Sequence, residues 1–594
     1  MLERNTRHYL KQLYSVVFLS ISFSLFSFSA PISSDWQIQR EKELNLQTQK
    51  IIPKAPDIHT DTNPLKSDAK LEIESPCFEI KKIELQGAKG FDFALAQTLD
   101  ILNIKDKVNK NGNGICIGQK GVLSISNTLQ NSIIARGYTT TRVLLKEQDL
   151  KSKVLKIDVV AGMVDKIRFE ESSGLKPHEQ NSLLFSAMPL KSGDILNIRP
   201  IEQALENFKR VPGFDASFDI APSSKPSHSD IVIKYQKSKF PFRIGFSIDD
   251  SGSMSTGKYQ VGTTLSGDNI LGLNDMFYLS YSRDMAGYDK TNITDSNGTI
   301  NGSTNGKSDN FALNYSFPVG YYLLSLGKSK YHYDQAVAGV NQVYRYMGNS
   351  ETVDIGISRV IYRSDKGKTT LSLKGLKRSS DNYIDDAKIT VQDRKTTSIE
   401  YGLAHKQFID NATLDMSLKY KVGIGAFDPL RAPEEAFGEG VSKPRIWMAD
   451  VSFTNPFLLQ EKQLNFTSTL HAQTTATPLV PQDRLSIGGR YTVRGFDGDY
   501  SLSSNKGFYL QNELSFSYLP SHQLYIAIDG GKVYGKSVDT LIGQSLVGTA
   551  LGVRGSFMNF GNLNYDLFAG TPIYKPQGFD TAKVSCGFNL NYSF

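Results

Sequence analysis

Short segments in which apolar and polar residues alternate strictly recur throughout residues 237–594. The clearest is the last, residues 584–594, where every even position is apolar and every odd position is small or polar. Because successive side chains of a strand point to opposite faces, each segment has one apolar and one polar face. A soluble sandwich also alternates, but its inward face must be apolar and its domains are shorter. We expect a 16-stranded outer-membrane barrel, with about 22 residues for each strand and its connection.

The composition agrees with a β-rich membrane protein. The 594-residue chain has no uninterrupted apolar stretch of the length that a transmembrane helix needs, which excludes a helical bundle. It contains 28 Tyr and 33 Phe but 2 Trp, together with 49 Gly, as expected for strands with aromatic girdles. The formal net charge of +7 is modest for this length and no dense basic block occurs. We therefore expect no nucleic-acid partner.

The amino-terminal residues have the features of an export signal. Arg4, Arg7 and Lys11 precede an apolar run, and Ser27 and Ser29 supply the small residues that signal cleavage requires. We predict a signal peptide over residues 1–29. An uncleaved anchor helix is the alternative, although the run is short and interrupted by serines.

Residues 30–50 are predicted to form a helix, and residues 51–75 a flexible linker. The helix has few apolar residues, among them Trp36 and Leu44, and is polar on nearly all sides. Such a helix is either exposed to solvent or lies in a water-filled lumen. The linker contains Pro53, Pro56 and many charges.

Residues 76–162 and 163–236 repeat one order of elements: strand, helix, helix, strand, strand. In the first unit we expect a helix over residues 120–136, ended by Gly137, and a strand over residues 138–146. The second unit has a helical pattern over residues 199–209 and a strand pattern over residues 214–220. The chain is thus predicted to carry two tandem α/β modules.

Two of the three cysteines, Cys77 and Cys116, fall within the first module. We predict a disulfide between them, which would stabilise a small module by about 3 to 4 kcal/mol in the chain-entropy model. A zinc site is the weaker alternative, because no pair of histidines lies nearby. Cys586 lies on the apolar face of the last strand and is expected to face lipid.

The segment Val493-Arg494-Gly495-Phe496 lies in a long loop between two alternating segments. An arginine beside flexible glycines within a run of barrel strands suggests a loop fixed inside a pore by one charge. An ordinary solvated arginine is the alternative. The sequence contains no Ser/His/Asp ordering and no phosphate-binding glycine loop. We therefore expect a transporter and not an enzyme.

Four passages, in this order, carry a resemblance to a known family: Cys77–Ile80 with Ile83–Gly87, Gly137–Val143, Thr256–Asp275, and the Val493–Phe496 loop. Together they resemble the two-partner secretion transporters, the TpsB group of the Omp85 superfamily. That group includes haemolysin and filamentous haemagglutinin secretion proteins and contact-dependent-inhibition transporters. The resemblance covers essentially the whole mature chain.

The resemblance implies two α+β POTRA domains in the periplasm, then a transmembrane antiparallel barrel of 16 strands with an N-terminal plug helix. It implies an outer-membrane pore of a Gram-negative bacterium that exports one large, unfolded exoprotein without ATP or any cofactor or metal. Its other partners are expected to be outer-membrane lipid and the barrel-assembly machinery, which would recognise the terminal Phe594. An assembly insertase of the same superfamily and a passive porin or adhesin barrel are the alternative functions.

The resemblance also implies roles for single residues. Arg494 is expected to pair with Asp529, although Ala527 stands where the family's motif has an aromatic residue. The N-terminal helix is expected to plug the lumen and to leave it during transport. Exported segments are expected to add a strand to an exposed module edge. The candidate edge residues are Tyr138, Arg142, Val143, Phe214 and Phe218.

Overall fold

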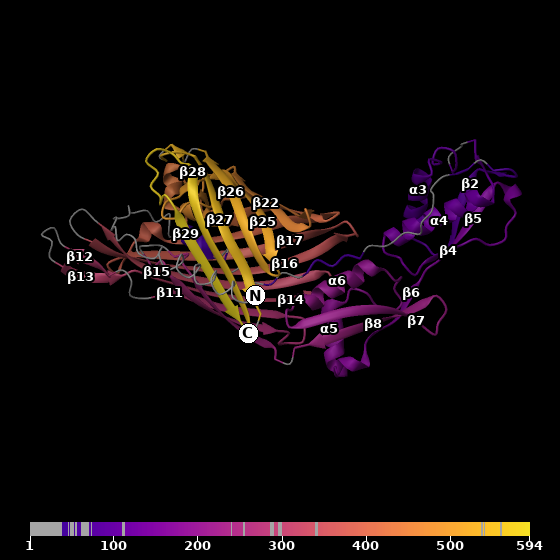
Figure 1. Ribbon diagram of the computed structural model, residues 1–594, viewed down its shortest axis with the longest axis horizontal. Coiled ribbons are helices and arrows are strands. Elements are labelled where there is room, and N and C mark those ends of the chain that lie inside the picture. The colour runs from indigo at the N-terminus through magenta and orange to yellow at the C-terminus, as the bar shows by residue number, and fades with distance from the viewer. Residues whose placement is uncertain are drawn as a thin grey trace, which may run out of the picture.

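The computed structural model describes most of the chain from residue 38 onward (Figure 1). The described residues are 38–44, 47, 53, 56–60, 71–72, 74–109, 113–238, 240–252, 256–285, 290–294, 300–338, 343–535, 538–539, 541–558 and 561–594. The predicted signal peptide and both ends of the predicted N-terminal helix lie outside these residues. Residues 38–44 are helical, and we call them the lumen helix.

The first module lies farthest from the barrel in Figure 1. Strand β2 pairs in parallel with β5, which pairs antiparallel with β4. Helix α4 packs on this sheet because Ile125, Leu129 and Ile133 recur at helical spacing and are fully buried. The elements are β1 (Phe78–Ile80), β2 (Lys82–Gly87), α3 (Asp92–Ile101), β3 (Ile115–Ile117), α4 (Gln119–Ala135), β4 (Arg142–Leu144) and β5 (Val154–Val160).

The second module lies between the first module and the barrel and has its own apolar core. Its sheet has the order β6-β8-β7, with β6 parallel and β7 antiparallel to β8. The side chain of Asn197 caps α6 by accepting a hydrogen bond of 2.8 Å from the Arg199 amide. The elements are β6 (Met163–Phe169), α5 (Pro177–Ala187), α6 (Ile198–Lys209), β7 (Phe214–Pro222) and β8 (His228–Lys237).

The two modules meet where the C-terminus of α4 faces the N-terminus of α6. The Ile198 amide donates to the Gly137 carbonyl at 3.0 Å, and Asn197 Nδ2 donates to the Arg136 carbonyl at 3.1 Å. Gly137 has a φ of 95°, and a Cβ there would lie 2.4 Å from Asn197 Oδ1. The glycine therefore both ends α4 and permits this close approach.

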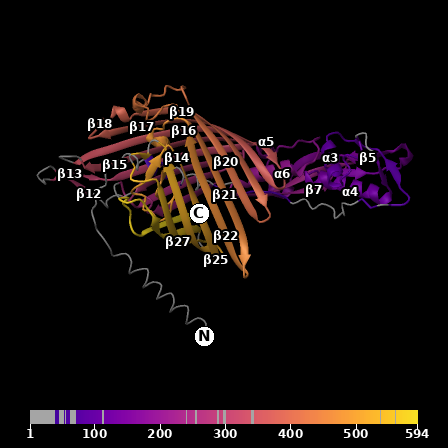
Figure 2. The same cartoon turned by 90° about the horizontal axis from the view of Figure 1, so that it is seen from above.

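A 16-stranded antiparallel barrel follows, with each strand paired to its neighbour in sequence (Figure 2). The short strand β18 (Ala387–Lys388) lies at the turn after β17, and β12 (Lys290–Thr294) pairs with β13 (Ile300–Asn305) outside the wall. The wall strands are β9 (Phe242–Asp249), β10 (Gln260–Asp268), β11 (Met276–Asp284), β14 (Lys307–Val319), β15 (Tyr322–Ala338), β16 (Val343–Arg363), β17 (Gly367–Ile384), β19 (Arg394–Ile409), β20 (Ala412–Ile424), β21 (Arg445–Leu459), β22 (Lys462–Thr475), β25 (Lys506–Leu519), β26 (His522–Tyr534), β27 (Ser545–Phe557), β28 (Asn562–Tyr574) and β29 (Ser585–Ser593).

The last strand, β29, closes the barrel by pairing with the first, β9. The pairing continues to the end of the chain, where the Phe594 amide donates to the Ile244 carbonyl at 3.2 Å. The predicted fold class is therefore confirmed. Among the described residues, no helix combines the length and apolarity that crossing a bilayer requires.

Alternation along β26 shows how the barrel separates its two surroundings. Leu524, Ile526 and Ile528 are exposed on the outer face, while Ala527 and Asp529 are buried on the inner face. The outer residues form an apolar surface for lipid and the inner ones line a polar lumen.

One strand of the first module is shorter than the sequence predicts. We expected it over residues 138–146, but β4 contains only Arg142–Leu144. Tyr138 lies before it and outside any strand, where its ring packs edge-on against Phe91 with centroids 5.1 Å apart. Its aromatic side chain serves the module core, which a periodicity of two does not reveal.

Candidate transport pore

Arg494 joins a long loop to the inner wall of the barrel. The loop, residues 476–505, connects β22 to β25, and we call it the lumen loop. Arg494 Nε donates to Asp529 Oδ2 at 2.7 Å and Nη2 donates to Oδ1 at 3.0 Å. The Arg494 amide also donates to Asp529 Oδ2, at 3.0 Å. The Asp529 carboxylate thus accepts two hydrogen bonds from the guanidinium and one from the Arg494 backbone. Three bonds to one carboxylate fix both the position and the orientation of the loop.

Two further charged residues complete this contact. Arg494 Nη1 donates to Glu513 Oε2 at 2.5 Å, and Arg554 Nη2 lies 2.7 Å from Glu513 Oε1. Two arginines and two carboxylates therefore alternate along the inner wall, and their formal charges cancel. Pairing and hydrogen bonding of this kind offset much of the cost of removing charges from water. The sequence reasoning missed Glu513, although its polar place in the alternation of β25 was a usable signal.

The residues on either side of Arg494 anchor the lumen loop by apolar contacts. Val493 and Phe496 are almost fully buried and belong to one cluster with side chains from β26, β27 and the segment before β29. The Phe496 ring packs edge-on against Phe579 with centroids 5.7 Å apart. The loop is held by an apolar cluster and by charges at the same point.

Glycines let the lumen loop lie directly on the wall. Gly495 has a φ of 103°, and a Cβ there would lie 2.5 Å from the Thr571 carbonyl oxygen. A Cβ on Gly548 of β27 would lie 2.1 Å from the Arg494 carbonyl oxygen, and one on Gly570 of β28 would lie 2.8 Å from the Gly495 Cα. Real Cβ atoms do not approach so closely, so these three positions require glycine while the loop is docked.

The lumen helix contacts the wall on different sides of the barrel. Glu41 accepts hydrogen bonds from Arg378 of β17 at 2.5 Å and from Ser350 of β16 at 2.8 Å. Arg40 donates to Ser251, just after β9, at 3.0 Å. Leu44 packs in a cluster with tyrosines of β15 and β16. A helix with contacts to separated wall strands crosses the lumen.

The same helix also contacts the lumen loop. Lys42 Nζ donates to the Arg484 carbonyl, and the side-chain Nε2 of Gln47, three residues beyond the lumen helix, donates to the Tyr491 hydroxyl. A cavity of about 780 Å³ remains in the lumen, bounded by Arg40, Leu44 and Gln47 and by the inner wall. The helix narrows the lumen without filling it and connects the loop to the wall.

Comparison with known proteins agrees with this architecture. Residues 227–555 match the family described as "Haemolysin secretion/activation protein ShlB/FhaC/HecB". Residues 78–162 match a ShlB-type POTRA domain and residues 163–222 a further POTRA domain. The chain belongs to this family. The predicted family is thereby confirmed, and so is the prediction of an outer-membrane transporter that is not an enzyme.

Relatives of this transporter match over most of their length. The chain is 34% identical to the outer membrane transporter CdiB-2 of Burkholderia pseudomallei (strain 1026b), with 95% of each chain covered. It is 23% identical to the hemolysin transporter protein ShlB of Serratia marcescens, covering 68% of this chain and 67% of the relative. The structure of CdiB from Acinetobacter baumannii superposes with a TM-score of 0.78 at 30% identity, covering 96% of this chain and 100% of CdiB.

The transporter's two modules present the predicted edges differently. Strand β7 is an edge of its sheet, and the rings of Phe214 and Phe218 pack against the core of the second module. Strand β4, which contains Arg142 and Val143, is also an edge, but only three of its residues pair with β5. Among the described strands, β7 thus offers the longer backbone edge, while Tyr138 lies outside any strand.

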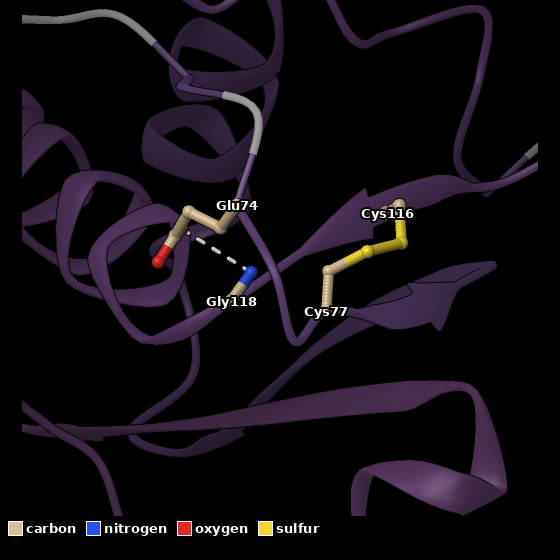
Figure 3. The surroundings of a disulfide bond; sticks show 4 residues. All are labelled: Glu74, Cys77, Cys116 and Gly118. Atoms are coloured by element: carbon tan, nitrogen blue, oxygen red, sulfur yellow. Dashed lines mark hydrogen bonds between the residues drawn. A yellow bond between two sulfur atoms is a disulfide. The ribbon is translucent and has the colours of Figure 1, made fainter.

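Near the start of the first module, a disulfide lies beside a capped helix (Figure 3). Cys77 and Cys116 are bonded with their Cα atoms 5.4 Å apart, linking the segment before β1 to β3. Glu74 accepts hydrogen bonds from the Gly118, Lys120 and Gly121 amides at 3.2, 2.9 and 2.6 Å. These amides begin α4, where a carboxylate is favoured. Within the described part of the chain, no cluster of His, Cys, Asp or Glu is arranged to hold a metal ion.

Proposed function

We propose that this transporter exports one large, unfolded exoprotein, the client, through the barrel to the cell surface or medium. The observation that carries the proposal is the polar lumen helix, held by side-chain contacts to the wall and to the lumen loop. Apart from Leu44, the contacts described for this helix are polar, so its displacement in a wet lumen would expose little apolar surface. Displacement would leave a passage lined by polar groups.

The two modules would receive the client before it enters the barrel. An extended segment can add to a sheet edge through backbone hydrogen bonds, which accept many side-chain sequences. Strand β7 is the leading candidate, since it is the longer of the two edges predicted and it lies in the module next to the barrel. β4, with Arg142 and Val143, is a shorter second candidate.

Arg494 and Asp529 would hold the lumen loop in a secretion-competent state. Phe594 would act as the signal that the barrel-assembly machinery recognises. Its ring is exposed at the end of β29 and is therefore accessible to a partner, while its backbone closes the barrel.

A secretion assay tests the proposed function. Cells that carry a large exoprotein encoded beside this chain are compared with cells from which the chain has been deleted. We expect the exoprotein to reach the medium or cell surface only when the chain is present. Equal export by both strains would contradict the proposal, and a general loss of outer-membrane proteins would favour the insertase alternative.

A further inference from the structure

A charged cluster lies where the second module meets the periplasmic rim of the barrel. Glu202 and Glu206 are one turn apart on α6, Arg199 precedes them, and Arg363 ends β16. All four side chains are nearly inaccessible to solvent, with exposures of 0 to 6%. We call these four residues the junction cradle.

The junction cradle binds residues 57–60 of the linker through main-chain atoms. The Ile58 amide donates to Glu206 Oε1 at 3.1 Å and the Thr60 amide donates to Glu202 Oε1 at 2.7 Å. Arg363 donates to the Ile58 carbonyl, and Arg199 Nη1 donates to the Thr60 carbonyl at 3.2 Å. Each residue, 58 and 60, thus has both its amide and its carbonyl bound.

The side chains of this segment alternate between two surroundings, as in an extended chain. Ile58 packs at the edge of the second module's core. Asp57 pairs with Lys406 of β19 at 2.6 Å, and the His59 ring stacks on Phe408 at 4.4 Å. The segment therefore lies like a strand between the module and the barrel rim, and its main chain is hydrogen-bonded to four charged side chains.

Recognition of this kind does not depend on the sequence of the bound segment. Along one edge of an extended chain, alternate residues present a main-chain amide and a main-chain carbonyl, except that proline has no amide donor. The cradle can therefore accept any extended chain. Burial alone would raise the pKa of Glu206, but hydrogen bonds and charge from Arg363 and Lys368 lower it overall. The carboxylate is therefore ionised and ready to accept amides.

We propose that the junction cradle is a binding site for an extended segment of the client, which residues 57–60 occupy in the resting transporter. This inference rests on the proposed function. Withdrawal of the linker would take one amide donor from each carboxylate, which is unfavourable unless another donor replaces it. Replacement by client main chain restores those donors at the entrance of the barrel. The linker thus acts as a built-in competitor that an incoming chain exchanges with.

Proline substitutions in the full-length transporter test the exchange. Ile58→Pro or Thr60→Pro removes one amide donor and weakens the linker as a competitor, while the cradle itself is unchanged. Asn63→Pro is the control, since it introduces the same residue into the linker but outside residues 57–60. A photo-crosslinking benzoylphenylalanine in place of Phe408 reports which chain lies in the cradle. The probe is reduced, carboxymethylated α-lactalbumin, a soluble unfolded polypeptide.

We expect crosslinking of the probe at position 408 to rise about tenfold in Ile58→Pro and Thr60→Pro, because the competitor's occupancy falls. It should stay near the starting value in Asn63→Pro and fall when Glu206→Gln is added to either of the other variants. Unchanged or lower crosslinking in both proline variants, each with a normally folded barrel, would overturn the inference and leave the linker as a structural strap. Secretion is measured separately. If export requires the transporter but the probe does not crosslink at position 408, the cradle proposal is refuted and the proposed function stands.

Discussion

At the scale of single residues, the docked lumen loop depends on groups that have no close substitute. Arg494 uses its fork for Asp529 and its remaining nitrogen for Glu513, so three of its donors are directed at carboxylates. A lysine carries the same charge, but its single nitrogen cannot form the two-pronged contact. Gly548 and Gly570 matter for the opposite reason, because they supply no side chain where the loop backbone rests on the wall.

Replacing Arg494 tests the fork directly. Arg494→Ala leaves Asp529 buried and unpaired, which should weaken loop docking by about 3 kcal/mol and nearly abolish secretion. Arg494→Lys should retain an intermediate level. Arg431, an arginine with an 89% exposed side chain, supplies the control Arg431→Ala. Client in the medium is measured together with the heat-dependent gel mobility of the barrel; full secretion by Arg494→Ala would refute the role.

A pair of glycines on neighbouring strands tests the close approach. In Gly548→Ala the new Cβ meets the Arg494 carbonyl, so the loop must move and secretion should fall at least several-fold. In Gly530→Ala the Cβ meets no atom closer than 3.8 Å, and secretion should be unaffected. Accessibility of the lumen loop to protease in intact cells checks the displacement. Equal behaviour of the two variants would show that the contact is unimportant.

At the scale of elements, periodicity predicted most of the architecture. Alternation identified the wall strands, and helical spacing located α4 and α6 to within one residue at each end. Periodicity overestimated the length of β4, because Tyr138 packs in the module core and is not part of a strand. Asp529 could be named from its motif, whereas Glu513 and Arg554 become partners only through the pairing of β25, β26 and β27. Register across strands is not encoded in any local pattern.

The disulfide is expected to stabilise the first module and not the barrel. Replacing Cys77 and Cys116 by serine should destabilise the first module by about 3 to 4 kcal/mol, since the unfolded module gains chain entropy. Trypsin digestion of the full-length protein should then remove the first module while the barrel stays intact. Cys586→Ser, a change on the exposed outer face of β29, is the control and should not alter digestion. Equal trypsin resistance in all three proteins would contradict the prediction.

At the scale of the whole molecule, one stretch of chain contacts every functional part. The lumen helix contacts the wall and the lumen loop, residues 57–60 contact the second module and the barrel rim, and Glu74 caps α4 of the first module. These contacts therefore lie on one continuous chain.

Two basic residues of β17 test how the helix is held in the lumen. Arg378→Gln removes the charge that holds Glu41, so we expect larger and more frequent ion conductance in planar bilayers. Lys374→Gln is the matched change, because Lys374 pairs with Asp354 of the wall at 3.0 Å and not with the helix. It should leave conductance unchanged. If the two variants conduct alike, the Glu41 contact does not retain the helix.

The end-to-end meeting of α4 and α6 has a mechanical consequence. The carbonyls of Arg136 and Gly137 accept hydrogen bonds from the cap and the first amide of α6, so the end of one helix is bonded to the start of the other. Arg210, just after α6, donates to the Asn274 carbonyl in the turn between β10 and β11 at 2.9 Å. A force applied to the first module is therefore expected to reach the barrel rim through these hydrogen bonds, close to the cradle residues that bind the linker.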